Sequence, residues 1–368
     1  MRLCDAGRQS STDSMNSDAQ DHDSAAVKEV LCSYFNMPSD TSHLAIQEKR
    51  FLGLGGPQFR YYYFTLTDGK RTCRAFGKTT LHHDREYRAL QYLTKTVPEQ
   101  YRNTSRPIAS LRQAGNSLLL LEYLEGYSSA LSMVNSLRLF PKRALNIIGL
   151  GKHIIDKIFD LQEHSPVIYT PLSLKDTDEI PCQPVPISIF EELRRIKSLS
   201  IETKEALRTR INALLSNQTL VRRGLIHGQL GMRNILVNHS NVLFIDWEYM
   251  QSAAFCLFDP CYMAIMLLMR AVQLLISSSK LDIINDDLFE RIRVREESLA
   301  GEANRRFVND ALWFAKCLSM VDTLYEYETG ESSRLKAVVG QKHRKIRYLA
   351  CHIEKDAANG AGCEGSRL

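Results

Sequence analysis

The chain has 368 residues, 44% of them hydrophobic, and a formal net charge of +5. A chain of this length can bury a large core, and the length suggests two lobes or two domains. The positive charge is small and dispersed, so it gives no indication of nucleic-acid binding. We therefore expect a globular protein without a nucleic-acid partner.

Cysteine usage predicts a reducing, cytoplasmic setting. The nine cysteines are scattered from Cys4 to Cys363 without a C-x-x-C pair, which argues against a thiolate metal site. Cys256 and Cys261 come closest to a pair, and we interpret them as core thiols because no His or Cys cluster lies near them in the sequence.

The first residues of the chain do not resemble a secretory signal. Residues 1–24 are rich in Ser, Asp, Asn and Gln and lack the apolar stretch of a secretory signal, so we expect a disordered tail there. A second tail is expected at residues 353–368. The most hydrophobic stretch, residues 261–276, is shorter than a membrane span and contains Arg270. It predicts a buried helix, and no membrane partner is expected.

The first predicted elements form a small lobe over residues 25–126. Apolar residues at helical spacing from Ala25 predict a short helix that Pro38 ends. Residues 51–78 are rich in aromatic and β-branched residues around the tight-turn pair Asp68-Gly69, which predicts a β-hairpin.

A helix and two more strands complete this lobe. Residues 82–93 predict a helix that Asp84 can cap, and residues 106–111 and 117–123 predict strands. The order of strands, helix and strands predicts a small antiparallel lobe, which Glu125-Gly126 closes as a linker.

The larger lobe, residues 127–352, is predicted to be mainly helical. A hairpin interrupts it near residues 224–249, where ILV and VLFID predict two short strands. The proline-rich segment 171–188 predicts a loop that is either a solvated connector or part of a substrate pocket. Helices are predicted at residues 144–164, 188–199, 201–217, 258–277, 304–327 and 332–352.

The most informative motif is HGQLGMRNILV at residues 227–237, followed by FIDWE at residues 244–248. The two segments resemble the aminoglycoside phosphotransferase and choline kinase family, whose members carry a His-Gly-Asp loop, an Asn five residues after the Asp, a short hairpin and Ile-Asp-Trp-Glu. The residues that match are His227, Gly228, Asn234, Ile245, Asp246, Trp247 and Glu248. This resemblance covers about residues 44–327 and implies an α+β, bilobal, protein-kinase-like fold.

The resemblance implies ATP and Mg²⁺ as cofactors. Phosphoryl transfer needs Mg²⁺ held by hard oxygen ligands, and the hairpin would bring the amide of Asn234 and the carboxylate of Asp246 to one point. His227 is expected to support the loop backbone. Asp259 resembles a structural aspartate of the family, but the interpretation that we favour from the sequence is a helix cap.

The remaining nucleotide contacts are expected in the small lobe. Arg74 occupies the place of the family's phosphate-binding lysine and could pair with Glu86, with Lys78 as the competitor. The turn that would cover the phosphates contains Gly53, Gly55 and Gly56, and the hinge that would hold adenine contains Glu122, Tyr123 and Leu124.

Gln229 departs from the family pattern because it stands where the catalytic Asp is expected. A carboxamide cannot accept a proton at neutral pH, so Gln229 cannot act as a general base. General-base catalysis typically contributes about 10²- to 10⁴-fold, whereas positioning and electrostatics supply most of phosphoryl transfer. Glu248 is a candidate substitute, because strand parity from Asp246 would place it on the metal-facing side.

Three functions therefore stay open. The first is a phosphotransferase that acts on a hydroxyl of a small molecule and is slowed by Gln229. The second is a catalytically silent pseudokinase that binds nucleotide as a regulatory module. The third uses the same site for nucleotidyl transfer or for phosphorylation-driven elimination. The basic run Lys342–Arg347 is interpreted as a solvated helix face, and neither the substrate nor the oligomeric state follows from the sequence.

Overall fold

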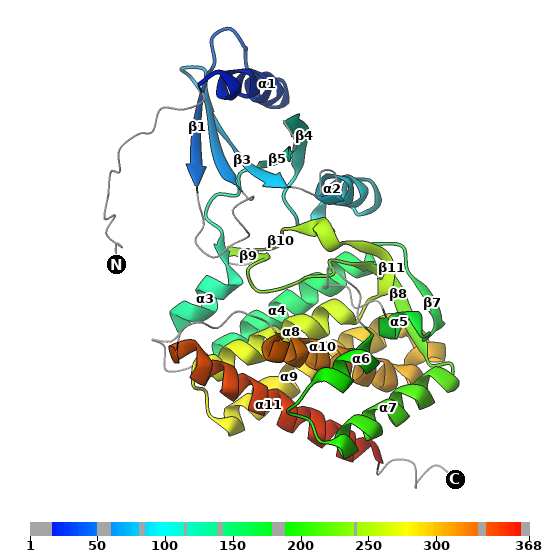
Figure 1. The fold of residues 1–368 in the computed structure, drawn as a ribbon. Coiled ribbons are helices and arrows are strands. Elements are labelled where there is room, and N and C mark those ends of the chain that lie inside the picture. Colours follow the sequence, from blue (N-terminus) through cyan, green and yellow to red (C-terminus); the bar gives the residue numbers. More distant parts are fainter. Residues whose placement is uncertain are drawn as a thin grey trace. The chain divides into compact units, whose positions relative to one another are not determined.

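The computed structural model describes residues 17–49, 60–80, 85–113, 116–137, 143–178, 188–238, 241–329 and 336–361. The chain divides into two compact units (Figure 1). Unit 1 comprises Met1–Tyr87 and Arg106–Tyr123, and unit 2 comprises Arg88–Ser105 and Leu124–Leu368. Unit 1 is built on an antiparallel sheet and unit 2 is mainly helical, so the predicted α+β class is confirmed.

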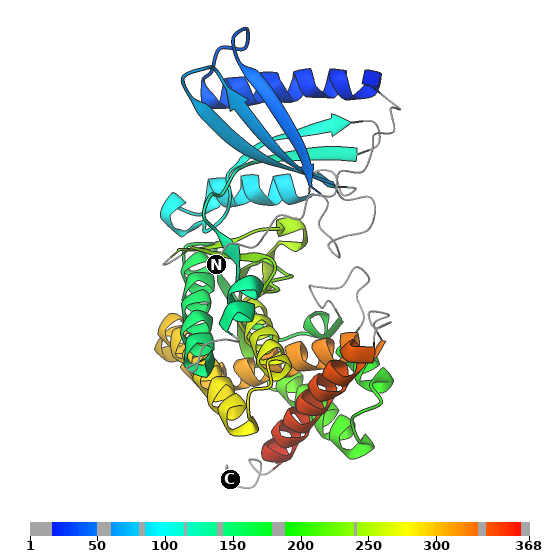
Figure 2. The same cartoon turned by 90° about the vertical axis from the view of Figure 1, so that its left-hand side faces the viewer.

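Unit 1 is a five-stranded antiparallel sheet in the order β1-β2-β3-β5-β4. Helix α1 lies on this sheet (Figure 2), where its side chains Val27 and Leu31 are buried against Phe64 and Leu120. The elements of unit 1 are α1 (Ser17–Phe35), β1 (His43–Lys49), β2 (Tyr61–Thr67), β3 (Thr72–Thr80), β4 (Pro107–Gln113) and β5 (Asn116–Glu122). Helix α2 (Arg85–Thr96) leads from unit 1 into unit 2.

The hairpin predicted around Asp68-Gly69 is confirmed, with β2 and β3 paired in register from Thr67↔Thr72. The Asp68 carboxylate accepts the backbone N–H groups of Lys70 at 2.9 Å and Arg71 at 2.7 Å. Gly69 has a φ of +82°, a conformation that glycine adopts without steric cost. The side chain at the start of the turn and the glycine within it therefore fix the strand register.

Unit 2 contains helices and two small sheets, in the orders β10-β9-β6 and β11-β8-β7. Its strands are β6 (Ser128–Ser129), β7 (Ile168–Pro171), β8 (Leu220–Ile226), β9 (Ile235–Asn238), β10 (Asn241–Phe244) and β11 (Gln251–Phe255). Its helices are α3 (Ala130–Ser136), α4 (Arg143–Glu163), α5 (Lys175–Asp178), α6 (Ile189–Arg195), α7 (Ile201–Ser216), α8 (Phe258–Gln273), α9 (Ser278–Asn304), α10 (Val308–Thr329) and α11 (Lys336–Ala361). Short 3₁₀ turns η1 (Glu99–Tyr101), η3 (Trp247–Tyr249) and η4 (Arg305–Phe307) connect them.

Helix α8 is the centre of the helical core, as the apolar stretch at residues 261–276 predicts. Most of its residues are buried, among them Cys261. Cys256, which precedes the helix, is buried as well. Among the described helices, none combines the length and the apolar content that a membrane span requires. The hydrophobic stretch thus serves packing within unit 2.

The long helix α9 was not predicted from the sequence. Its buried residues Leu281, Ile284, Leu288 and Ile292 recur at helical spacing, but charged residues separate them throughout. The strands β7, β8 and β11 were likewise missed. They form a sheet that leads into the loop with the His-Gly motif, so the predicted hairpin is only part of the β-structure in unit 2.

The ends of the described chain are helical. Helix α1 begins at Ser17, within the segment 1–24 that the sequence predicts as a tail, and α11 continues to Ala361, within the second predicted tail. The domain boundaries inferred from the sequence otherwise stay predictions.

Candidate active site

The His-Gly loop lies between β8 and β9 and turns sharply at its second residue. Gly228 has a φ of +83°, and a Cβ atom placed there would lie 2.4 Å from the backbone oxygen of Tyr249. Any side chain at this position would therefore collide with backbone that cannot move aside. The glycine is required because the loop passes close to the segment after β10.

A buried carboxylate holds the start of this loop. Asp259, in the first turn of α8, accepts the backbone N–H of His227 at 2.5 Å and the N–H of Gly228 at 3.1 Å. Burial raises the pKa of Asp259 to about 7, although these two N–H donors act to lower it. Asp259 does not cap its own helix, so the helix-cap interpretation is wrong and the structural role that the family resemblance implied fits the contacts.

His227 contacts backbone through both ring nitrogens. Its Nε2 lies 2.8 Å from the carbonyl oxygen of Ile245, and its Nδ1 lies 3.4 Å from the backbone nitrogen of Gln229. A carbonyl can only accept and an amide N–H can only donate, so these contacts fit the tautomer that carries its proton on Nε2. The ring is buried and packs on Trp247 with 4.5 Å between ring centroids. His227 therefore joins the two motif segments mechanically.

Gln229 is half-buried, and within the described part of the chain its hydrogen bonds all use its backbone. Its carbonyl oxygen accepts the side-chain Nδ2 of Asn234 at 3.0 Å and the backbone N–H of Gly231 at 2.9 Å. Because Asn234 uses its Nδ2 in this contact, its Oδ1 is the amide atom that could bind a metal ion.

Asp246 has a left-handed backbone, with φ 70° and ψ 56°. For a residue with a Cβ this conformation is uncommon and costs about 1–3 kcal/mol, and such residues concentrate at functional sites. The preceding residue, Ile245, donates its N–H to the carbonyl oxygen of Asn234 at 2.9 Å. One backbone hydrogen bond thus joins the two segments that carry the predicted metal ligands.

The hairpin β9–β10 pairs Val237 with Val242, as the sequence predicts, and is held from both sides. On one side, the N–H of Phe244 donates to the carbonyl oxygen of Asn103 at 2.7 Å, and Trp247 Nε1, just after the hairpin, lies 3.0 Å from Thr104 Oγ1. On the other side, β6 pairs with β9. The position of Asp246 is therefore set by several elements of unit 2, because its two neighbours in the sequence, Ile245 and Trp247, both have fixed partners.

The ion pair in unit 1 differs from the one expected. The Nζ of Lys78 on β3 lies 3.2 Å from Glu86 Oε2 in the first turn of α2, and only 9% and 5% of the two side chains are exposed. The sequence analysis favoured Arg74 as the partner of Glu86, and this prediction is wrong. Lys78, four residues later, makes the buried pair. Arg74 is exposed, and its guanidinium carbon lies 5.9 Å from the ring centroid of Tyr123.

The predicted hinge residues lie at the end of β5. Glu122 Oε1 accepts the hydroxyl of Tyr34 on α1 at 2.7 Å, and its backbone N–H donates to Arg106 at 3.0 Å. Tyr123 packs edge-on against Tyr63, with 5.6 Å between ring centroids. Of the other predicted nucleotide contacts, Gly53, Gly55 and Gly56 lie outside the described residues.

The prediction that strand parity places Glu248 on the metal-facing side is wrong. Strand β10 ends at Phe244, Asp246 is left-handed, and Glu248 lies in the 3₁₀ turn η3. Side chains alternate only along an extended strand, so parity gives no orientation for Glu248. Sequence reasoning also missed Thr104, since no motif indicated that a residue so distant in the sequence contacts Trp247.

The described residues contain no group of three or more His, Cys, Asp or Glu that could hold a metal ion. The predicted pair of Asn234 and Asp246 would be a different kind of site, because Mg²⁺ bound with a nucleotide takes one or two protein oxygens and completes its shell with phosphates and water. One amide oxygen and one carboxylate, placed by adjoining backbone, fit that requirement.

No protein-family model matches the sequence, and no curated protein matches it. Among solved structures, the chain is similar to a thermostable mutant of an aminoglycoside phosphotransferase in complex with AMP-PNP and hygromycin B. The identity is 14%, the match covers 92% of this chain and 99% of that chain, and the TM-score is 0.49. It is also similar to the choline kinase LicA from Streptococcus pneumoniae, at 14% identity over 90% of this chain and 99% of that chain, with a TM-score of 0.42.

These are the two classes of protein that the motifs resemble.

Proposed function

We propose that this protein is an ATP- and Mg²⁺-dependent phosphotransferase that acts on a hydroxyl group of a small molecule, with a rate limited by Gln229. The observation that carries the proposal is the joining of Asn234 and Asp246 through the hydrogen bond between Ile245 N–H and Asn234 C=O, beside Gln229. These residue types at one point suit phosphoryl transfer, which depends mainly on positioning and electrostatics.

Asn234 and Asp246 would hold the metal ion. When bound, Mg²⁺ would neutralise charge on the phosphates of ATP. Asn234 offers Oδ1 because its Nδ2 donates to Gln229, and Asp246 offers the carboxylate. The left-handed backbone of Asp246 and the buried Trp247 after it fix the backbone from which this carboxylate would reach the metal. The residues are therefore preorganised for a hard cation.

Lys78 would contact the nucleotide phosphates, and Glu86 would orient it. In protein kinases an ion pair between a strand lysine and a helix glutamate has to be formed for activity. The pair of Lys78 and Glu86 has this arrangement, since one partner lies on β3 and the other on α2. Arg74 is the less suitable residue because its exposed side chain is directed toward Tyr123.

Gln229 would hold the acceptor hydroxyl without removing its proton. Its carboxamide can accept a hydrogen bond from the hydroxyl and so orient the oxygen for attack. In a loose transition state the proton needs to leave only late, so orientation alone supports slow transfer. The expected deficit relative to a carboxylate is about 10²- to 10⁴-fold.

The test begins with nucleotide binding. Thermal shift with ATP is measured with and without Mg²⁺, and ATP consumption is then followed against a panel of hydroxylated small molecules. We expect stabilisation that depends on Mg²⁺ and slow consumption with at least one acceptor. A chain that Mg-ATP does not stabilise at any concentration would contradict the proposal.

A second candidate is a nucleotide-binding pseudokinase, which Gln229 itself favours. This protein would show the same Mg²⁺-dependent stabilisation but no ATP consumption with any acceptor, even in the Gln229→Asp variant. A third use of the site, nucleotidyl transfer, would release pyrophosphate, so measuring pyrophosphate as well as ADP distinguishes it from the kinase.

A further inference from the structure

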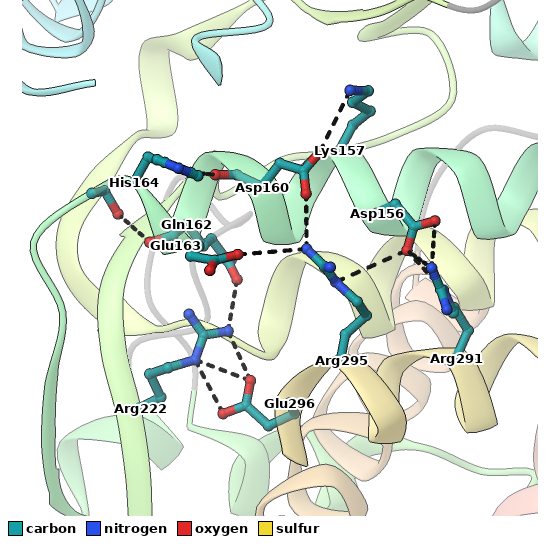
Figure 3. Close-up of polar contacts among 11 residues, drawn as sticks. Asp156, Lys157, Asp160, Gln162, Glu163, His164, Arg222, Arg291, Arg295 and Glu296 are labelled. Carbon is teal, nitrogen blue, oxygen red and sulfur yellow. Dashed lines mark hydrogen bonds and ion pairs between the residues drawn. The ribbon is translucent and has the colours of Figure 1, made fainter. Parts of the chain in front are cut away.

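A buried polar network lies beneath the sheet that carries the His-Gly loop (Figure 3). Arg222 on β8 and Glu296 on α9 are each only 2% exposed. Arg222 donates from Nε and Nη2 to the Glu296 carboxylate, with distances of 3.0 and 2.7 Å to Oε2. Its Nη2 also donates to Gln162 Oε1 on α4 at 3.0 Å. Three elements that are distant in the sequence therefore meet at one guanidinium.

The same network extends to the strand beside β8. Gln162 Nε2 donates to the carbonyl oxygen of Cys256 at 2.8 Å, and the Cys256 N–H donates to the carbonyl oxygen of Arg222 at 3.0 Å. Cys256 follows β11 directly, and β11 pairs with β8 up to Phe255↔Arg223. The Gln162 side chain thus connects the end of the β8–β11 pair to α4 by a hydrogen bond.

Both strands lead from this network to the candidate active site. Five residues after Arg222 comes His227, and three residues after Cys256 comes Asp259, which accepts the N–H groups of His227 and Gly228. The loop is therefore connected to the network along two short stretches of backbone. A shift of Arg222 or Cys256 would be transmitted to His227, because strands are stiff and Asp259 ties their far ends together.

A second set of ion pairs between α4 and α9 provides a contrast. Arg291 contacts Asp156 at 2.7 and 2.8 Å, and Arg295 contacts Asp160 at 2.8 Å (Figure 3). These side chains are partly exposed, with 37% of Arg291 and 29% of Asp156 accessible. They join the same two helices as the buried network but make no contact with β8 in the described structure.

We propose that Arg222, Glu296 and Gln162 are positioning residues that set the place of the His-Gly loop on α4 and α9. A buried ion pair contributes little net stability compared with well-packed apolar residues of similar size, so stability alone gives a weak reason for it. Its directional contacts instead select one position of β8. The inference rests on the proposed function only for its effect on phosphoryl transfer, since the effect on the loop itself is measurable without activity.

The experiment removes the network while keeping the fold. In the variant Arg222→Met with Glu296→Leu, both charges leave together, because removing one alone leaves the other buried and unpaired. Gln162→Met is the second variant, which keeps the ion pair and cuts only the tie to Cys256. The matched control is Arg291→Met with Asp156→Leu, which removes an ion pair between the same two helices.

Hydrogen exchange of the full chain reports the loop directly. We expect the amides of His227 and Gly228 to exchange at least about tenfold faster in both network variants, at a melting temperature close to that of the unaltered protein, and to stay unchanged in the control. Turnover of ATP should also fall, because the same loop carries Gln229 and contacts Asn234.

Two results would overturn the inference. One is unchanged exchange at His227 and Gly228 in a folded network variant, and the other is equal acceleration in the control. If the double variant does not fold, Gln162→Met decides by the same criterion. If the unaltered protein neither binds nor consumes Mg-ATP, the proposed function fails, but the exchange comparison still decides whether the network positions the loop.

Discussion

The loop region of unit 2 and the ion-pair region of unit 1 are organised by different means. Around the loop, the main constraints are backbone shapes and backbone hydrogen bonds: the positive φ of Gly228, the left-handed Asp246 and the contact between Ile245 and Asn234. In unit 1 the main constraint is one buried side-chain pair, Lys78 with Glu86.

This difference explains why the loop is easier to recognise in the sequence than the ion pair. A backbone turn demands particular residue types at fixed spacing, so it leaves a motif. A long side chain can reach its partner from more than one position along a strand, and Arg74 and Lys78 lie on the same face of β3. The same difference predicts how the two regions respond to substitution.

The largest effect is expected for Gln229→Asp. If the loop has an intact backbone and lacks only a base, this variant should raise ATP consumption with a suitable acceptor by about 10²- to 10⁴-fold. Single-turnover rates at saturating Mg-ATP measure the change. Gln229→Asn is the control, because it alters length without supplying a base. No increase in the Asp variant would indicate that the pocket beside residue 229 has been remodelled.

The next effect concerns the stability of unit 1. Lys78→Met leaves Glu86 buried without this partner and should lower the free energy of unfolding by about 3–5 kcal/mol. Arg74→Met removes an exposed side chain that contacts Tyr123 and should cost no more than about 1 kcal/mol. Urea denaturation compares the two variants. A larger loss for Arg74→Met would contradict the assignment of Lys78 as the partner of Glu86.

Loss of the carboxylate at Asp246 should remove the metal response. Asp246→Ala is expected to weaken Mg²⁺-dependent nucleotide binding by about 100-fold or more, since even residues behind a metal ligand contribute about 10- to 100-fold. Titration of ATP at several Mg²⁺ concentrations gives the value. Asp246→Asn is the informative control, because Asn also tolerates the left-handed backbone and so isolates the charge. An unchanged Mg²⁺ dependence in both variants would rule out Asp246 as a ligand.

A change of pH provides a further prediction, through Asp259. Burial raises its pKa to about 7, so between about pH 4 and pH 7 the folded state binds more protons than the unfolded state. The contribution of Asp259 to stability should therefore be largest below pH 4 and decline as the pH rises to about 7. Asp259→Asn should flatten this part of the stability profile, measured by denaturation at several pH values. A profile that is the same in both proteins would show that burial does not raise this pKa.

Much of the fold was predictable because local patterns agreed with tertiary packing. Asp68-Gly69 predicted the hairpin β2–β3, and the periodicity of residues 144–164 predicted α4. Helix α9 was missed because charged residues separate its buried apolar residues, and three of these charged residues, Asp287, Arg291 and Arg295, pair with α4. Strand β8 was missed because its neighbours β7 and β11 are distant in sequence.

The sequence by itself determined where the candidate loop lies, because Gly228 and Asp246 meet backbone requirements that only a few residue types satisfy, and the Asn234 side chain binds the loop backbone at that spacing. It also determined that Gln229 cannot be a base, since that follows from the chemistry of a carboxamide. Only the tertiary structure decided that Lys78 is the partner of Glu86 and that Asp259 holds the loop. The physical reason is that side-chain reach and burial depend on packing between elements, which leaves no fixed spacing in the sequence.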